Sequence, residues 1–394
     1  MHRTKKRPIA SVTIVSIFLI ILFLPGFGLK IVSFVTGNPM DVTLNGYTDS
    51  VNVVSANTNT WFSGELQQYW SKNFEEKLKP RGLMVKTYNT INFLLFNESL
   101  RIIGKNRDIF ELQYINAELV LTDADDFSIE SNVREMSNFV QLLREVREKL
   151  NCLGKELLVY VAPSKAAIFP ENIPDRYFLY SREHARSVDV FRQEIEKTDV
   201  PYLICSDLLE KLTYPPFYTT GIHWSRTYEQ YASHVILERM AQITGNQYGN
   251  IEWEKVESSK KPFLRDSDVL DLANVFYRPD VTYYKYKTHW TEGEENVPIR
   301  LLLQGDSFSI GLMTDIQENN TEAEVHWISR NNTMQSMGEV INFKGDWAQL
   351  DLQHYLEKVD IVVVEIVEPL LKNYSFGFVQ ALSEVLENSD IPQL

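Results

Sequence analysis

The pattern of hydrophobic and polar positions along the chain predicts two kinds of element, buried strands and amphipathic helices. Two short runs are apolar at almost every position, IRLLLQ at 299–304 and DIVVVEIV at 360–367. Both lack the alternation of a half-exposed strand and are bounded by polar residues, which is typical of parallel strands buried on both faces. Further strands are predicted at 156–162 and 201–205.

Apolar residues recur at helical spacing in four other segments, 61–79, 131–150, 181–197 and 226–242. Ser131 is the predicted N-cap of the second helix. Because helices and strands alternate, we expect an α/β domain with a parallel sheet and helices on both of its faces. The first helix is expected to place six large side chains in a core: Trp61, Leu66, Tyr69, Trp70, Phe74 and Leu78.

The N-terminus departs from this pattern. Four basic residues between Arg3 and Arg7 precede an uncharged run at 8–29, long enough at about 1.5 Å per residue to cross roughly 30 Å of hydrocarbon. We therefore predict a transmembrane helix with a cytoplasmic basic flank, which makes the protein a single-pass protein of the cell membrane with an extracytoplasmic C-terminal domain. A cleaved signal peptide is the alternative, because 26–28 (Gly-Phe-Gly) is a loose small-x-small site.

These patterns predict an anchor at 1–30, a spacer at 31–60 and one domain at 61–394, with an insertion at about 250–298. Inside the insertion, the segment FYRPDVTYYKYKTHW carries six aromatic residues among charges. One interpretation is a glycan-binding surface, since aromatic rings stack on sugars and charged neighbours bind hydroxyls. The other is a hairpin packed on the rim of the sheet.

Composition excludes some functions. The chain of 394 residues has a formal net charge of -14, and beyond the N-terminus no basic patch stands out, so nucleic acid is not an expected partner. Cys152 and Cys205 are too few for a disulfide framework and lack the CxxC spacing of a zinc site. We expect both to be buried free thiols, with a single bridge left open, and we predict no metal and no cofactor.

The segment LLLQGDSFSIG, 301–311, presents a serine where a predicted strand meets a helix that begins near Phe308. Ligands of open α/β sheets lie beyond the carboxyl ends of the strands, and Ser307 is at such an end. Gly305 would permit a tight turn, and the backbone N–H of Ser307 is the first candidate to bind an oxyanion. Gly, Asp and Ser are also ordinary turn and N-cap residues, so a purely structural role is the alternative.

A candidate base lies in FYTTGIHWS, 217–225, where His223 occupies a loop and Trp224 can pack and fix that loop. Imidazole can take the proton of a serine hydroxyl during acyl transfer. A lone histidine is more often structural, and the other six histidines have weaker contexts.

The histidine–tryptophan loop followed by GDSFS resembles the AlgX/AlgJ alginate O-acetyltransferase family, whose domain is SGNH-hydrolase-like and has its histidine block before its serine block. Segments at 92–111, 160–174 and 360–371 also resemble the family, so the likeness spans about 61–374. It implies a three-layer SGNH-hydrolase-like fold with Ser307 as nucleophile and His223 as general base.

The chain departs from the family at the third member of the triad. The family has an aspartate two residues before the histidine, where this chain has Gly221, so another acid or a backbone carbonyl orients the ring, or activity is lost. The acids that offer a substitute are Asp306, Asp266, Asp268 and Asp271. A second departure is Pro369 in place of the arginine of the late E-x-x-E-R motif. There, solvation explains Glu365 and Glu368 almost as well as function does.

Two cations complete the candidate site. Arg330 follows the next predicted strand and is a second candidate for the oxyanion, with an exposed structural arginine as the alternative. Lys165 follows the strand at 156–162 and either lines the same cleft or forms a salt bridge on its rim.

The resemblance implies a membrane-anchored extracytoplasmic O-acetyltransferase that acts on a cell-surface or secreted polysaccharide through acetyl-Ser307. It also implies a membrane-bound O-acyltransferase partner as the acetyl source. Three alternatives remain: a polysaccharide O-acetylesterase, a catalytically impaired polysaccharide-binding or assembly protein that has lost the orienting acid, and an envelope scaffold.

Overall fold

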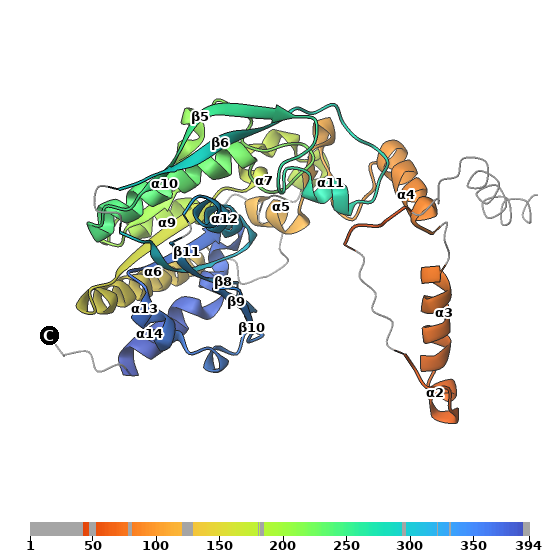
Figure 1. The fold of residues 1–394 in the computed structure, drawn as a ribbon. Coiled ribbons are helices and arrows are strands. Elements are labelled where there is room, and N and C mark those ends of the chain that lie inside the picture. Colours follow the sequence, from red (N-terminus) through yellow and green to blue (C-terminus); the bar gives the residue numbers. More distant parts are fainter. Residues whose placement is uncertain are drawn as a thin grey trace, which may run out of the picture. The chain divides into compact units, whose positions relative to one another are not determined.

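The computed structural model describes residues 42–46, 53–77, 81–119, 129–179, 181, 185–293, 297–320, 322–330 and 332–388 (Figure 1). The chain forms two compact units, one of 1–100 with 270–278 and one of 101–269 with 279–394. The predicted anchor at 1–30 and much of the predicted spacer lie outside the described residues. Among the residues that are described, no helix is long and apolar enough to cross a membrane.

A seven-stranded sheet forms the centre of the second unit, in the order β10-β9-β8-β7-β11-β3-β4. Strands β8, β7, β11, β3 and β4 are parallel, whereas β9 pairs antiparallel with both β8 and β10, so the expectation of a wholly parallel sheet was wrong. The reason is the short connection from β8 to β9, residues 330–332, since a parallel crossover needs about a dozen residues or more. The strands are β3 (Glu156–Ala162), β4 (Tyr202–Ile204), β7 (Arg300–Gly305), β8 (Glu324–Ser329), β9 (Thr333–Ser336), β10 (Glu339–Asn342) and β11 (Ile361–Val367).

The apolar runs occupy the middle of this sheet. All seven residues of β11 are buried, and β11 pairs in parallel with β7 on one side and β3 on the other. Strand β3 begins and ends at the predicted residues. A strand covered on both faces cannot expose an alternating polar row, which explains its continuous run of apolar residues.

Helices flank the sheet, as predicted. Helix α6 packs against α9 and α14, α10 packs against α12, and β3 contacts both α6 and α10. The predicted N-cap Ser131 lies inside α6, so that boundary was wrong. The longer helices of this unit are α5 (Leu112–Leu119), α6 (Ile129–Cys152), α9 (Ser187–Ile195), α10 (Arg226–Thr244), α12 (Ile310–Asn319), α13 (Leu352–Lys358) and α14 (Phe378–Asn388).

Short elements connect the sheet to these helices. They are β1 (Ile102–Ile103), β2 (Ile109–Phe110), α7 (Lys165–Ile168), α8 (Asp175–Phe178) and the 3₁₀ turns η2 (Lys105–Arg107), η3 (Pro170–Asn172), η4 (Cys205–Lys211), η5 (Ser307–Ser309), η6 (Trp347–Gln349) and η7 (Glu368–Gly377).

The inserted segment contains an antiparallel hairpin of β5 (Asn250–Ser259) and β6 (Tyr283–Thr291), which runs alongside α10 (Figure 1). The side chain of Gln230 in α10 donates to the carbonyl of Tyr286 at 3.0 Å and accepts from its N–H at 2.8 Å. The Tyr286 ring stacks on Trp253 with centroids 4.5 Å apart. The insertion thus forms a hairpin, as one interpretation had it, but these contacts place it on α10 and not on the rim of the sheet, and glycan binding by the insertion stays a prediction.

The first unit is helical, with α2 (Thr58–Phe62), α3 (Glu65–Lys77), α4 (Arg81–Ile91) and the π-helical turn η1 (Asn92–Phe96). The helix predicted at 61–79 is interrupted at Gly64, whose φ of 83° is left-handed. The expectation that its tryptophans belong to a core was wrong, because Trp61 and Trp70 are 49% and 52% exposed. Their rings contact each other edge to face, with centroids 6.1 Å apart.

Both cysteines are free thiols, so the structure contains no bridge between them. Cys205 is buried as expected. Cys152 is exposed, and the prediction of its burial was wrong because it is the last residue of α6, where the helix leaves the core.

Candidate active site

Ser307 lies in the turn between β7 and α12, at the carboxyl end of a central strand. Asp306 caps the turn, since its Oδ1 accepts a hydrogen bond from the N–H of Phe308 at 2.8 Å. The N–H of Ser307 donates to no acceptor within the described residues. This amide is therefore available to an oxyanion, and its role in binding one stays a prediction.

Gly305 is required by close packing and not by backbone conformation, because its φ is not positive. A Cβ atom at this position would lie 2.7 Å from Oε2 of Glu365. That same oxygen accepts a hydrogen bond from the N–H of Asp306 at 2.7 Å. Glu365 in β11 thus supports the nucleophile turn from the neighbouring strand.

Glu365 and Asp306 form a buried acidic pair under Ser307, each 1% exposed. Burial raises the pKa of both carboxyls, and the charge of Asp306 raises that of Glu365 further. The hydrogen bond from the N–H of Phe308 and the charge of Arg330 lower the pKa of Asp306, so Glu365 is the carboxyl of the two that holds a proton more readily. Of the two explanations left open for Glu365 and Glu368, surface solvation is excluded, since Glu368 is also only 5% exposed.

His223 contacts both Ser307 and an acid. Its Nε2 lies 2.7 Å from Oγ of Ser307, and its Nδ1 lies 2.6 Å from Oδ2 of Asp268. With the Nδ1 proton directed to the carboxylate, Nε2 is left as the acceptor for the serine proton. The side chains of His223 and Asp268 are 10% and 18% exposed, so the pair is shielded but reachable from solvent.

Asp268 occupies the space beside Gly221. Its Oδ1 accepts a hydrogen bond from the N–H of Ile222 at 3.2 Å. A Cβ atom on Gly221 would lie 2.9 Å from that oxygen and 2.9 Å from the carbonyl oxygen of Asp266. The glycine that lacks the family's carboxylate is therefore the residue that lets another carboxylate reach the histidine.

The other three candidate acids do not contact the imidazole. Asp266 is buried and accepts hydrogen bonds from the N–H groups of Arg226 at 2.9 Å and Phe263 at 3.3 Å. Asp306 caps the nucleophile turn. Asp271 belongs to the other compact unit, where it pairs with Arg278 at 3.2 Å.

The two candidate cations have different places. Arg330 is exposed, its N–H donates to the carbonyl of Gly305 at 2.7 Å, and its guanidinium lies 5.7 Å from the ring centroid of Phe376. Lys165 is 1% exposed and forms its ion pair, with Asp108, inside the fold. The predicted salt bridge of Lys165 is therefore present, but it is buried and not on the rim, and the prediction that Lys165 lines the cleft was wrong.

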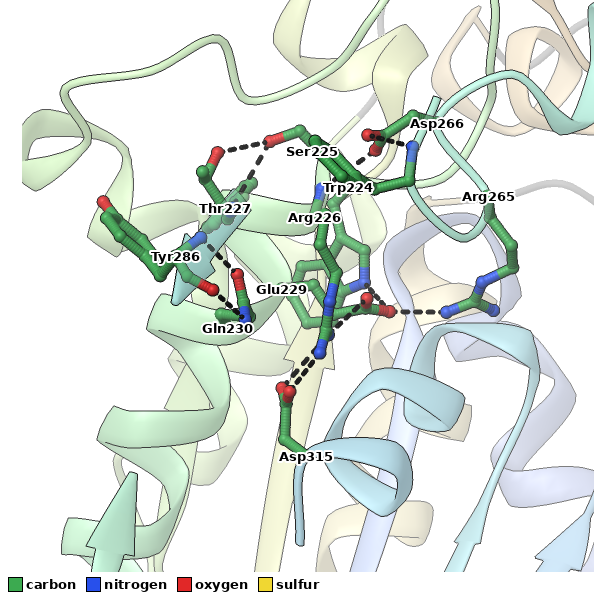
Figure 2. Close-up of polar contacts among 12 residues, drawn as sticks. Trp224, Ser225, Arg226, Thr227, Glu229, Gln230, Arg265, Asp266, Tyr286 and Asp315 are labelled. Carbon is green, nitrogen blue, oxygen red and sulfur yellow. Dashed lines mark hydrogen bonds and ion pairs between the residues drawn. The ribbon is translucent and has the colours of Figure 1, made fainter. Parts of the chain in front are cut away.

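A polar network centred on Glu229 links the histidine loop to the nucleophile turn, and Figure 2 shows its contacts among Trp224, Arg226, Arg265 and Asp315. Glu229 accepts hydrogen bonds from Arg265 at 2.5 Å, from Arg226 at 3.0 Å and from the indole N–H of Trp224 at 3.3 Å. Arg226 also pairs with Asp315 of α12, and Arg265 donates to the carbonyl oxygen of Ser307. Two arginines thus balance two carboxylates. Removal of one partner of such a buried set typically costs about 3–5 kcal/mol.

Sequence reasoning missed Arg265, Glu229 and Asp315 as supports of the site. Arg226 and Glu229 lie in the first turn of α10 beside the Ser225 N-cap, where a basic residue has no helix-dipole reason to be. The position of Arg226 was therefore the signal in the sequence that could have indicated a buried acidic partner.

Together, the fold and the geometry define an SGNH-hydrolase-like α/β domain with a serine–histidine–aspartate arrangement. Residues 122–270 match the family model of the SGNH hydrolase-like domain, acetyltransferase AlgX. The match, which covers less than half of the chain, confirms the predicted resemblance to the AlgX/AlgJ-like family. A comparison with curated proteins gave no match.

Three solved bacterial structures match the chain. The O-acetyltransferase domain of Pseudomonas putida AlgJ has 16% identity over 73% of this chain and 100% of that one, with a TM-score of 0.43. Pseudomonas aeruginosa AlgX has 14% identity over 71% of this chain and 67% of that one, with a TM-score of 0.41. Bacillus cereus PatB1 has 12% identity over 61% and 91%, with a TM-score of 0.37.

Proposed function

We propose that the protein is an O-acyltransferase that carries an acetyl group on Ser307 and passes it to a hydroxyl group of a polysaccharide. The observation that carries this proposal is the contact chain from Ser307 to His223 at 2.7 Å and from His223 to Asp268 at 2.6 Å. The match of 122–270 to an acetyltransferase domain supports the acetyl group, and the family resemblance supports the polysaccharide acceptor.

In the first half of the reaction, Nε2 of His223 takes the proton of Ser307 while the serine oxygen attacks the carbonyl carbon of the acyl donor. The N–H of Ser307 is placed to stabilise the oxyanion that forms. The bond from the carbonyl carbon to the leaving group breaks, and His223 returns the proton to that group. Asp268 holds the ring and stabilises its charged form during these steps.

In the second half, a sugar hydroxyl gives its proton to His223 and attacks the carbonyl carbon of acetyl-Ser307. The ester bond to the serine breaks, the sugar carries the acetyl group, and the proton returns to Ser307. Water in place of the sugar would make the same site an esterase. We propose that the N-terminal apolar run anchors the domain outside the cell near a membrane-bound acyltransferase, which would supply the acetyl group at a high effective concentration.

A chromogenic acetyl ester tests the serine step without knowledge of the polymer. The full-length chain should release the chromophore in a burst and gain an acetyl group on Ser307, seen by mass spectrometry of its peptides. Ser307→Ala should show neither. Equal behaviour of the two proteins would refute the acyl-enzyme proposal.

A further inference from the structure

Lys165 is a fully buried lysine that uses its ammonium group inside the protein. Its Nζ lies 2.8 Å from Oδ1 of Asp108, and it donates to the carbonyl oxygens of Tyr218 at 2.7 Å and Gly221 at 3.0 Å. An ammonium has three N–H donors, and these three partners satisfy all of them.

Two of those partners belong to the histidine loop. Tyr218 and Gly221 lie five and two residues before His223, in a stretch without regular secondary structure. Such a loop has few ladder hydrogen bonds to hold it, so the donors from Lys165 fix its path. Lys165 itself is the first residue of α7, directly after β3, and is therefore anchored to the centre of the sheet.

The pair with Asp108 is itself held in place. Oδ2 of Asp108 accepts a hydrogen bond from the side chain of Asn172 at 2.6 Å, and the ammonium lies 5.5 Å from the ring centroid of Phe110. Burial lowers the pKa of Lys165, whereas the charge of Asp108 and, more weakly, that of Asp268 raise it. The cation therefore lies within electrostatic range of the acid that orients His223.

We infer that Lys165 is a positioning residue, which holds the carbonyl groups of Tyr218 and Gly221 so that Asp268 and Ser307 meet the two nitrogens of His223. The inference rests on the proposed function for its catalytic consequence, although the positioning itself does not. The same carbonyl of Gly221 belongs to the glycine that makes room for Asp268, so a shift of this loop would close that space.

A double variant separates positioning from simple charge balance. Lys165→Met leaves the Asp108 carboxylate buried and unpaired, which destabilises the fold for a trivial reason. Lys165→Met/Asp108→Asn removes both charges, so its melting temperature should recover most of that loss. Lys155→Met is the matched control, because Lys155 also donates to a backbone carbonyl, that of Val359 at 2.7 Å, at the opposite end of β3.

Hydrogen exchange of residues 217–225 in the full-length chain reads the position of the loop without any substrate. We expect these amides to exchange at least about tenfold faster in the double variant than in the wild type, with little change elsewhere. Lys155→Met should exchange like the wild type in this segment. Unchanged exchange in a folded double variant would overturn the inference.

A sulfonyl fluoride then reads the effect on the serine. In that reaction the Ser307 oxygen displaces fluoride from sulfur, and its proton passes to His223. The double variant should be labelled at least about tenfold more slowly than the wild type, and labelling at the wild-type rate would overturn the catalytic part of the inference. A wild-type chain that resists labelling would instead refute the proposed function, while exchange still decides the role of Lys165.

Discussion

The placement of the third triad member makes a sharp prediction for Asp268. Asp268→Asn removes the carboxylate that lies 2.6 Å from Nδ1 of His223 while it keeps the side-chain volume. Two unit charges about 3 Å apart attract by roughly 5–6 kcal/mol at an effective dielectric of about 20. Solvent reaches part of this pair, since the Asp268 side chain is 18% exposed, so some of that energy is returned by water.

We therefore expect Asp268→Asn to raise the barrier to acylation by about 3–5 kcal/mol, a loss of about 100- to 10,000-fold in rate. Presteady-state release of chromophore from an acetyl ester measures that step directly. Asp271→Asn is the matched control, because it makes the same change three residues later and should keep the wild-type rate. Wild-type acylation by Asp268→Asn, with its melting temperature unchanged, would show that another group orients His223 and would refute the reasoning.

Three further predictions follow from the packing and burial described above. Gly221→Ala places a methyl group against two oxygens 2.9 Å away and should cost about 1–3 kcal/mol of unfolding free energy along with activity, measured by thermal melting and ester hydrolysis; a fully stable, active variant would contradict it. Because burial raises the pKa of Glu365 in the folded state, this group contributes stability in acid, and that contribution is lost as pH rises through the folded-state pKa. Glu365→Gln mimics the protonated form and should therefore flatten the fall in melting temperature with rising pH. An unaltered slope would exclude the Glu365–Asp306 pair as the cause of that fall. A maleimide should modify Cys152 in the folded chain and Cys205 only after unfolding, and rapid modification of both under native conditions would contradict the described burial.

Much of the sheet could be predicted because its strands are buried on both faces. The boundaries of the strand at 156–162 could be predicted, since polar residues or turns lie where the strand leaves the core. The antiparallel edge formed by β9 and β10 was not predicted, although the short connection after β8 excludes a parallel crossover there. Trp61 and Trp70 of the first unit have helical spacing but are about half exposed among the described residues, and spacing alone does not distinguish a buried face from an exposed one.

The chemistry of the site was predictable only in part. Ser307 and His223 could be predicted because each belongs to a local sequence pattern. Ser307 lies in a strand-to-helix turn, and His223 lies in a loop beside a tryptophan. Asp268 lies 45 residues from His223, and nothing in its local sequence separates it from Asp266 or Asp271. Only the path of the loop decides which of those carboxylates faces the ring. The same is true of Lys165, whose burial depends on an acid that lies 57 residues earlier in the chain.

The contact between Gly221 and Asp268 also has an evolutionary consequence. If a chain had a carboxylate at position 221 as well as at position 268, the two acids would compete for the same space, because a Cβ at position 221 already comes within 2.9 Å of the Asp268 oxygen. Exchange between the family's arrangement and this one would then pass through an intermediate with neither acid, or through a change in the loop at 263–268. A glycine two residues before the histidine is thus compatible with an orienting acid that comes from elsewhere in the chain, and aspartate at that position is not a requirement for a complete triad.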